Sequence, residues 1–173
     1  IKSFYFELSF DFFHYWTHRI GHHRFFYFIH KKHHEYTNNL IASATFHHSF
    51  LDLLCTNFIP LLLTSYIVPM SKLQLMIFMI YKVYLEISGH LGMYLTSNSF
   101  VQFVWLPRIF GIEMYAKDHY LHHAHNNCNY AKRFTIWDKL FGTYKTVESI
   151  EDEQQKTNDH SDSTPESILD YLD

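Results

Sequence analysis

The sequence predicts an all-α protein, a membrane-associated helical bundle that contains one transmembrane hairpin. Three observations support this fold class. No stretch of the 173 residues keeps the apolar–polar alternation of a β-strand. Two apolar stretches each have about the 20 residues that a helix needs to cross a bilayer. Histidines number 15, more than lysine and arginine together, and aromatic residues reach 19 %, which indicates metal ligands close to an apolar environment.

The composition also excludes several other classes of protein. The net charge of −3 argues against a basic nucleic-acid-binding surface, so we expect no nucleic-acid partner. Two cysteines, Cys55 and Cys128, are too few for a disulfide scaffold. Low-complexity and collagen-like sequences are disfavoured because the chain has only five glycines and four prolines.

The first part of the chain predicts two helical segments. Phe4–His23 is dense in aromatic residues, and Ser3 is a suitable N-cap for it. Phe25–Tyr36 continues the helical pattern after a short break, and the polar residues 37–39 end it. These segments precede the apolar stretches in the sequence.

The apolar stretches Ser49–Val68 and Lys72–Leu91 are expected to form the transmembrane hairpin. The three residues between them allow only a turn between antiparallel helices. An even number of crossings returns the chain to the side it left, which we expect to be the cytosol. A buried hairpin in a soluble bundle is the alternative. Polar groups at membrane depth normally face the protein interior and are candidates for function; here they are Asp52, Asn57, Lys82 and Glu86.

The remaining part of the domain is also helical in pattern. Thr96–Ser99 predicts a loop, because short polar side chains bond to their own backbone. Glu113–His125 predicts a helix and Asn126–Asn129 a loop. Ile136–Phe141 predicts a short helix that Gly142 closes.

Charge divides the chain into two parts, a domain at 1–147 and a tail at 148–173. The tail carries nine acidic residues and one lysine, a net charge of −8, while the domain carries +5. The tail has few apolar residues, so we expect it to be solvated and mostly disordered, with at most a short helix at Pro165–Leu172. The basic excess of the domain favours a cytosolic face.

Eight histidines recur at spacings that suit a metal site. One HxxxH motif and two HxxHH motifs place side chains on one helix face, so each triplet should offer three imidazoles to one cavity. Neutral imidazole binds zinc, copper, iron or nickel. Eight ligands exceed the four of a tetrahedral zinc site, so we expect two metal ions. The eight are His18, His22, His30, His33, His34, His119, His122 and His123.

The other histidines divide into one further ligand and several structural residues. His90, at the end of the second apolar stretch, is expected as a ninth ligand. His47 and His48 are expected to form structural hydrogen bonds, with metal binding by one of them as the alternative. His23 and His125 point away from the motif faces. A metal-binding imidazole donates its second N–H to a carboxylate or carbonyl, and the nearest candidates are Asp11, Glu35, Glu86, Asp118 and Asp138.

At this point the sequence resembles the fatty acid hydroxylase superfamily, which includes sterol desaturases and sterol C4-methyl oxidases. The resemblance covers about residues 8–145. Its three histidine boxes look like HRIGH (18–22), HKKHH (30–34) and HYLHH (119–123), and WDKLFGT (137–143) is the segment least expected by chance. EISGHLG around His90 resembles a further family segment, whereas HHSFLD around His48 matches another only faintly.

The resemblance implies a membrane-bound oxidoreductase, a di-metal monooxygenase type of enzyme with its metal site facing the cytosol. Such enzymes use O2 to hydroxylate or desaturate a lipid, here a sterol or fatty acyl chain, with the sterol C4-methyl oxidases as the nearest subgroup. Iron is the expected metal and zinc the alternative, because imidazole ligands alone do not separate them. The electron donor would be separate, such as cytochrome b5 with an NAD(P)H-dependent reductase. The protein would be multi-pass, in the endoplasmic reticulum of a eukaryote, and the family's upstream membrane helices would precede residue 1.

Two other functional classes remain to be weighed. The acyl-CoA desaturase fold also uses HxxxH and HxxHH boxes, but its first two boxes lie much further apart than His22 and His30, and it lacks WDKLFGT. A non-catalytic or degenerate metal-binding membrane protein would keep the histidines without the reaction. Consumption of O2 in the presence of a lipid extract separates this class from the lipid oxidases.

Overall fold

The computed structural model describes residues 2–36, 42–90, 96–97 and 105–162. Within these ranges the protein is mostly helical, as predicted. Its β-structure there is limited to one isolated bridge and a two-residue antiparallel pair, β1 (Thr96–Ser97) with β2 (Met114–Tyr115). The predicted loop at Thr96–Ser99 therefore contains a short strand in its described half.

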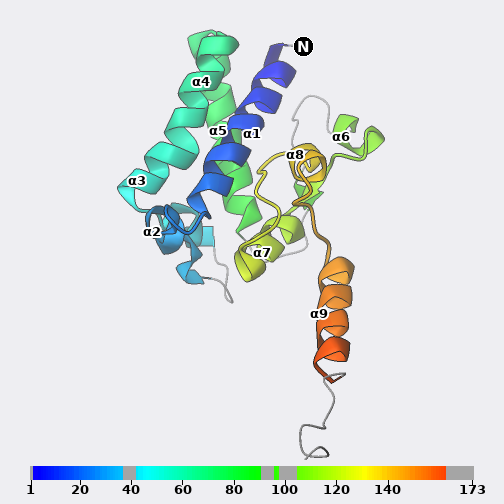
Figure 1. Cartoon of the computed structure of the whole chain (residues 1–173). Helices are drawn as coiled ribbons and strands as arrows, with labels where there is room; N and C mark the ends of the chain where they lie inside the picture. Colours follow the sequence, from blue (N-terminus) through cyan, green and yellow to red (C-terminus); the bar gives the residue numbers. More distant parts are fainter. Residues whose placement is uncertain (1, 37–41, 91–95, 98–104, 163–173) are drawn as a thin grey trace, which may run out of the picture.

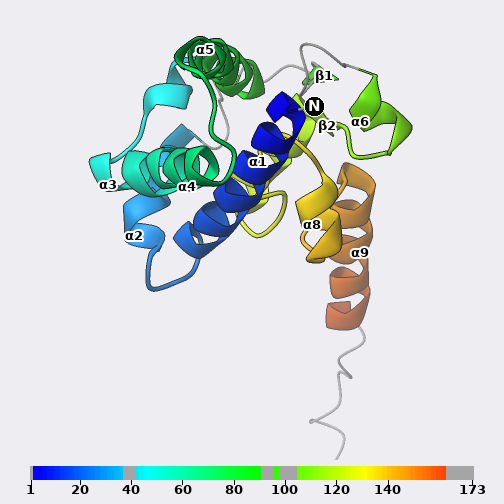
Figure 2. The ribbon, with the colours of Figure 1, turned by 90° about the horizontal axis from the view of Figure 1, so that it is seen from above.

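Three helices lie side by side in one half of the molecule (Figures 1 and 2). One is the N-terminal helix, and the other two follow each other in the sequence. They are α1 (Lys2–Gly21), α4 (Ile59–Ile67) and α5 (Lys72–Gly89). Ser71 begins α5 with a capping box, in which its hydroxyl accepts from the Gln74 N–H.

An aromatic cluster joins these three helices. Phe6 and Phe10 of α1 are fully buried against Phe78 of α5. The Phe78 ring meets both of them edge to face, with centroids 4.7 Å from Phe6 and 5.4 Å from Phe10. Such pairs stabilise a core beyond the area they bury. Leu61 of α4 completes the cluster.

The first apolar stretch forms one helical rod with a wide turn inside it. The rod consists of α3 (Phe50–Asp52), the π-helix η3 (Leu53–Phe58) and α4. Pro60 has no N–H for the Thr56 carbonyl four residues earlier. His14 Nδ1 on α1 donates to that carbonyl instead, at 2.7 Å. The proline thus frees an acceptor that fixes α1 to the rod.

The segment after α1 differs from the single helix that the pattern predicts. It consists of a four-residue helix, α2 (Tyr27–His30), and a 3-10 helix, η1 (Lys31–Tyr36). A second 3-10 helix, η2 (Ala42–Phe46), follows after residues 37–41, which lie outside the described ranges. Because a 3-10 helix has about three residues per turn, His33 and His34 point in different directions from those expected on an α-helix.

The C-terminal half supplies further short helices, of which α7 lies lower in the view of Figure 1 than α6 and α8. They are α6 (Leu106–Ile109), α7 (Ala116–His125) and α8 (Ile136–Leu140). Gly142 follows α8 with a φ of +68°, the left-handed conformation that was predicted to close this helix.

The acidic tail is more ordered than its composition predicts. Helix α9 (Val147–Asp162) occupies its described part and projects from the domain (Figure 1). The reason is local: Thr146 and Ser149 cap the helix start by bonding each other's backbone N–H, and Glu148 lies in the first turn. The short helix expected at Pro165–Leu172 lies outside the described residues.

One described helix is long and apolar enough to cross a membrane, by length and composition, and it is the rod Phe50–Ile67. Only 22 % of this stretch is buried within the protein. Helix α5 was expected as the second span, but it carries Lys72, Lys82 and Glu86 over its length. The transmembrane hairpin therefore stays a prediction. As predicted, the polar side chains of these stretches face inward: Asp52, Lys82 and Glu86 are all buried.

A single carboxylate fastens α1 to the loop before α8. Asp11 is fully buried and accepts three backbone N–H groups, from Lys132 and Arg133 at 2.8 Å and from Phe134 at 3.0 Å. This loop also holds Tyr130, whose carbonyl lies beside His18 of α1. Asp11 therefore sets the position of α1 against the C-terminal half.

We expect Asp11→Ala to destabilise the fold strongly. It leaves three backbone donors without their acceptor, and an unsatisfied buried donor costs about 1–3 kcal/mol. A total loss of about 3 kcal/mol or more should lower the melting temperature in detergent by roughly 5–10 °C. The exposed Asp152 of α9 provides the control, since Asp152→Ala should leave the melting temperature unchanged. Equal melting temperatures for both variants would show that the Asp11 contacts do not stabilise the fold.

Candidate metal centre

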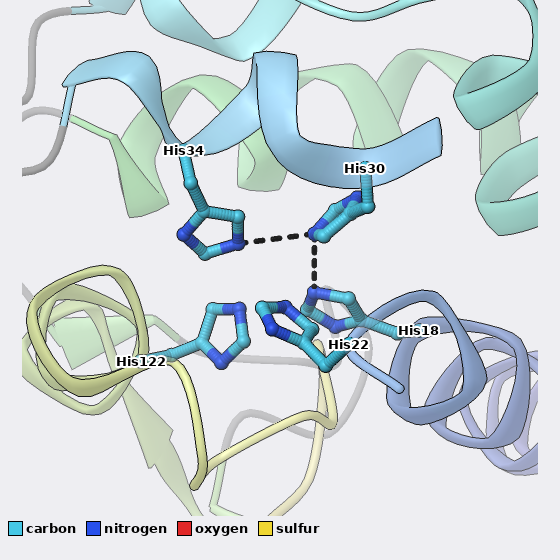
Figure 3. Close-up of side chains that lie close together, drawn as sticks. All are labelled: His18, His22, His30, His34 and His122. Atoms are coloured by element: carbon cyan, nitrogen blue, oxygen red, sulfur yellow. Dashed lines mark hydrogen bonds between the residues drawn. The ribbon is translucent and has the colours of Figure 1, made fainter. Parts of the chain in front are cut away.

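All nine histidines predicted as ligands converge in one region of the structure. They come from α1 and the residue after it, α2 with η1, the residue after α5, and α7. The side chains lie in two neighbouring groups with nitrogen atoms no more than 4.8 Å apart within each group. Eight of the nine are buried, and His22 is half-buried. The first group is His18, His22, His30, His34 and His122 (Figure 3), and the second is His33, His90, His119 and His123.

Each HxxHH triplet is divided between the two groups, which corrects the expectation that one triplet serves one cavity. His34 belongs to the first group and His33 to the second; likewise His122 belongs to the first and His123 to the second. Adjacent residues on a helix point about 100° apart around its axis. Adjacent histidines therefore cannot face one ion, and the doubled histidine supplies one ligand to each group.

Backbone carbonyls determine which nitrogen of the first group faces the centre. His18 Nδ1 lies 2.7 Å from the Tyr130 carbonyl, and His122 Nδ1 lies 2.7 Å from the Cys128 carbonyl. A carbonyl only accepts hydrogen bonds, so each Nδ1 carries the proton. The Nε2 atom of each ring therefore presents a lone pair to the centre.

Asp52 performs the same task for His30. His30 Nδ1 donates to Asp52 Oδ1 at 2.8 Å, and His48 Nδ1 donates to the other carboxylate oxygen at 3.0 Å. Asp52 is fully buried, and its own N–H donates to Ser49 Oγ at the helix start. The His48 ring in turn stacks on His33 of the second group, with centroids 4.6 Å apart. One carboxylate thus supports both groups.

The inward nitrogens of the first group lie at the spacing of ligands around one metal ion. His18 Nε2 and His30 Nε2 are 3.0 Å apart, and His34 Nε2 is 3.1 Å from His30 Nε2 (Figure 3). Because Nδ1 is the donor in both His18 and His30, the Nε2 lone pairs of these two rings face each other and repel. Two imidazole nitrogens on one metal ion, each about 2.0–2.1 Å from it, are about 3–4 Å apart. The donor set of this group therefore fits one metal ion, and His22 Nε2 and His122 Nε2 are buried with no other partner.

The second group has the same character. His90 Nδ1 donates to the Glu86 carbonyl at 2.7 Å, which leaves Nε2 as an acceptor. His90 Nε2 lies 3.2 Å from His119 Nε2 and 3.4 Å from His33 Nε2. His123 Nε2 lies 3.2 Å from His119 Nε2. These four imidazoles also have the spacing of ligands around one ion.

The electrostatic environment favours the neutral form of His22, His119 and His122. Burial, with a smaller contribution from the neighbouring His30, lowers the pKa of His22 to about 3. Burial, followed by the nearby Lys132 ammonium, holds the pKa of His119 well below 6.5. Burial also holds the pKa of His122 well below 6.5. Because metals bind the neutral form of histidine, both groups are ready for metal near pH 7.

Most of the carboxylates predicted to support the ligands bond to other groups instead. Glu35 accepts from His47 Nε2 at 2.7 Å, which gives His47 the structural role expected for it. Asp118 accepts the Tyr115 N–H at the start of α7.

The other predicted supports act through the backbone. Asp138 accepts the N–H of Tyr130 and thereby supports His18 only indirectly. Glu86 supports His90 with its backbone carbonyl rather than its side chain.

Sequence reasoning missed Asp52 as a supporting residue. Its signal was present but weak: an acid four residues after His48, in a segment that matches the family pattern only faintly. The carbonyls of Tyr130, Cys128 and Glu86 have no sequence signal at all. His23 and His125 lie outside both groups, as their spacing predicts.

The chain belongs to the fatty acid hydroxylase family, because the sequence model of that family matches residues 4–143. It is 32 % identical over 141 residues to a fatty acid hydroxylase of Lecanicillium sp, covering 77 % of this chain and 39 % of that protein. It is 34 % identical over 145 residues to a Delta(7)-sterol 5(6)-desaturase of Gibberella zeae, covering 83 % and 37 %. It is 29 % identical over 138 residues to a C-4 methylsterol oxidase of Schizosaccharomyces pombe, covering 77 % and 43 %.

These comparisons confirm the predicted family, and the relatives are oxidoreductases by name. The chain spans about two-fifths of the length of these relatives. No solved structure matches the chain. The relatives are named as a fatty acid hydroxylase, a sterol desaturase and a methylsterol oxidase.

We expect Asp52→Asn to weaken metal binding about 10- to 100-fold in the full-length protein, the usual effect of losing a carboxylate behind a ligating histidine. The amide has one acceptor oxygen for two N–H donors, so either His30 or His48 loses its anchor. Metal content after dialysis against graded chelator measures the effect. Glu35→Gln is the matched control, because Glu35 contacts His47 outside both groups. If both variants retain metal equally, Asp52 does not support the ligands.

Proposed function

We propose that the protein is a membrane-bound, O2-dependent lipid hydroxylase or desaturase that works with a dinuclear, histidine-ligated metal centre. The observation that carries this proposal is the pair of adjacent imidazole groups, five residues and four, whose nitrogens face one another at ligand spacing. Family membership supports the lipid substrate, since the relatives are named as sterol and fatty acyl enzymes.

The two groups are close enough to act as one centre. The rings of His34 and His123, which belong to different groups, have centroids 4.5 Å apart. His30 and His33 are likewise 5.2 Å apart. Two ions held by such groups would lie side by side and share one substrate, as in other two-metal sites. We propose iron for this pair, with zinc as the alternative that imidazole ligands also suit.

When bound, the metal pair supplies the reduction of O2 that lipid oxidation needs. In hydroxylation, one C–H bond becomes C–OH while O2, two electrons and two protons yield one water. In desaturation, two adjacent C–H bonds are lost and both oxygen atoms leave as water. The two electrons come from a separate donor, for which we propose cytochrome b5 and an NAD(P)H-dependent reductase.

The protein's own residues hold and shield this chemistry. The Tyr130, Cys128 and Glu86 carbonyls direct each supported ring so that Nε2 faces the centre. Burial keeps the rings neutral and excludes bulk water, which limits escape of reactive oxygen species. The scaffold therefore positions the ligands before any substrate arrives.

We propose that the helices α4 and α5 form a membrane hairpin. Their outer faces expose large apolar side chains, among them Leu62, Tyr66 and Ile67 on α4 and Leu73 and Ile80 on α5. Such an apolar surface is solvated poorly by water and well by lipid chains. The histidine groups lie towards the opposite end of α5 from the turn that joins α4 to α5 (Figure 1). We place that end at the cytosolic surface, of the endoplasmic reticulum in a eukaryote.

We expect His22→Ala to reduce lipid oxidation at least 100-fold in the full-length protein. The variant removes a metal bond and misaligns the remaining ligands. The adjacent His23 is exposed and lies outside both groups, so His23→Ala should keep wild-type turnover and metal content. O2 consumption with a lipid extract and product analysis by mass spectrometry measure both variants. A wild-type protein that binds metal but consumes no O2 with its electron donor present would instead be a non-catalytic metal-binding protein.

Cysteine labelling tests the hairpin. In a background with Cys55→Ser and Cys128→Ser, we expect Lys31→Cys and Lys117→Cys to react with a membrane-impermeant maleimide from the cytosol. Ser71→Cys, in the turn, should react only from the opposite side. All three native residues are exposed, so accessibility differences report the membrane side. Labelling of positions 31 and 117 from opposite sides would disprove the topology, since the two histidine segments could not then share one centre.

A further inference from the structure

A pocket of about 280 Å³ lies between the rod α3–η3–α4 and helix α5, beside the histidine groups. Its wall is largely apolar and includes Phe46, Leu53, Phe58 and Val83. These four side chains are also exposed, between 40 % and 67 %. The mouth of the pocket is therefore apolar and opens on the helix surface that we propose to face lipid. A ligand would enter from the bilayer.

The inner part of the pocket is polar and borders the proposed metal centre. His48 lines it and stacks on His33 of the second group, with ring planes 11° apart. Glu86 also lines it, and the Glu86 carbonyl anchors His90. The inner end of a bound ligand would thus lie next to the second histidine group.

Among the polar residues of the pocket, Lys82 offers a donor and His48 an acceptor. Lys82 Nζ donates to Asn57 Oδ1 at 2.6 Å and to Glu86 Oε1 at 3.0 Å, which uses two of its three N–H groups. His48 Nδ1 donates to Asp52, so His48 Nε2 is an acceptor on a ring that lines the pocket. A hydroxyl group matches this pair because it both accepts and donates. A carboxylate only accepts, and it would face the His48 lone pair and the Glu86 carboxylate.

We propose that this pocket binds a lipid alcohol with its hydroxyl group innermost, between Lys82 and His48, and its apolar body among the residues of the mouth. This inference rests on the proposed lipid-oxidase function and specifies its substrate class. The C–H bond that is oxidised would lie within a few bonds of the hydroxyl-bearing carbon. Oxidation at the far end of the lipid is disfavoured, because that end remains at the mouth.

Equilibrium binding to the full-length protein in nanodiscs tests the proposal without turnover. The probes form two matched pairs, cholesterol with its 3-methyl ether and 1-hexadecanol with palmitate. We expect the alcohol to bind about tenfold more tightly than its partner in each pair that binds, as loss of one good hydrogen bond predicts. Equal or tighter binding of the ether or of palmitate would overturn the proposal, as would the absence of binding by both alcohols.

Variants at the pocket separate its role from the metal centre. Val83→Trp should fill the mouth and weaken binding of the alcohol at least tenfold, with metal content unchanged. Ile80→Trp is the matched control, because Ile80 lies one turn earlier on α5, is 65 % exposed and does not line the pocket.

Lys82→Met should weaken binding of the alcohol about tenfold. Because this variant leaves Glu86 with one fewer partner, its melting temperature is measured together with its binding. If Lys82→Met does not fold, the binding result of Val83→Trp tests the pocket. Unchanged binding by Val83→Trp would contradict the assignment of the pocket.

The two proposals fail in different ways. Selective binding of alcohols without any lipid oxidation by the reduced, metal-loaded protein would leave this pocket intact and contradict the proposed function. Oxidation of a lipid without selective binding of the alcohol would support the proposed function and contradict the assignment of this pocket. Mass spectrometric mapping of the product adds a further check, since a new oxygen or double bond remote from the hydroxyl contradicts the orientation proposed here.

Discussion

Repulsion between buried imidazole lone pairs is the constraint on which the rest of the structure depends. His18 Nε2 and His30 Nε2 face each other at 3.0 Å, and hydrogen bonds at Nδ1 fix both as acceptors. Burial removes the water that would otherwise separate them, and it holds the pKa of His18 well below 6.5. A bound cation would satisfy the arrangement, and this is why we propose the region as a metal site.

Holding such ligands requires supports that are themselves rigid. Asp11 binds three consecutive N–H groups of the loop after Tyr130, and Asp138 binds the N–H of Tyr130 itself. The Tyr130 carbonyl can therefore hold His18 in one orientation. On the other side, the missing N–H of Pro60 frees the Thr56 carbonyl for His14, which fixes α1 against the apolar rod. The metal centre thus depends on contacts between segments that are far apart in the sequence.

The polar residues of the apolar helices have a consistent purpose. Asp52 supports His30 and His48, while Lys82 and Glu86 pair with each other at the inner end of the pocket. Lys132 extends this ion-pair network, 3.1 Å from Glu86 and 3.5 Å from His119 Nε2. Charges are costly in an apolar region unless they are paired. Their pairing here joins the apolar pocket to the histidine groups, so the surface that we propose to face lipid and the proposed site of oxidation are parts of one structure.

The sequence by itself determined the helical class, the family and the identity of the nine converging histidines. These follow from local information: residue type, the 3.6-residue period and short spacings such as HxxxH. It also indicated that the polar residues of the apolar stretches face inward. Helix α9 shows a limit of composition as a guide, because capping by Thr146 and Ser149 is a matter of specific side-chain contacts.

Only the tertiary structure decided how the histidines are shared between two groups and what holds them. The doubled histidines divide because neighbouring residues point in different directions, but which direction leads to which group depends on how α7 packs against α1 and η1. The supports of His18, His90 and His122 are backbone carbonyls. Every residue carries a carbonyl, so sequence cannot single one out; only the path of the folded chain brings a particular carbonyl within 2.7 Å of a particular ring.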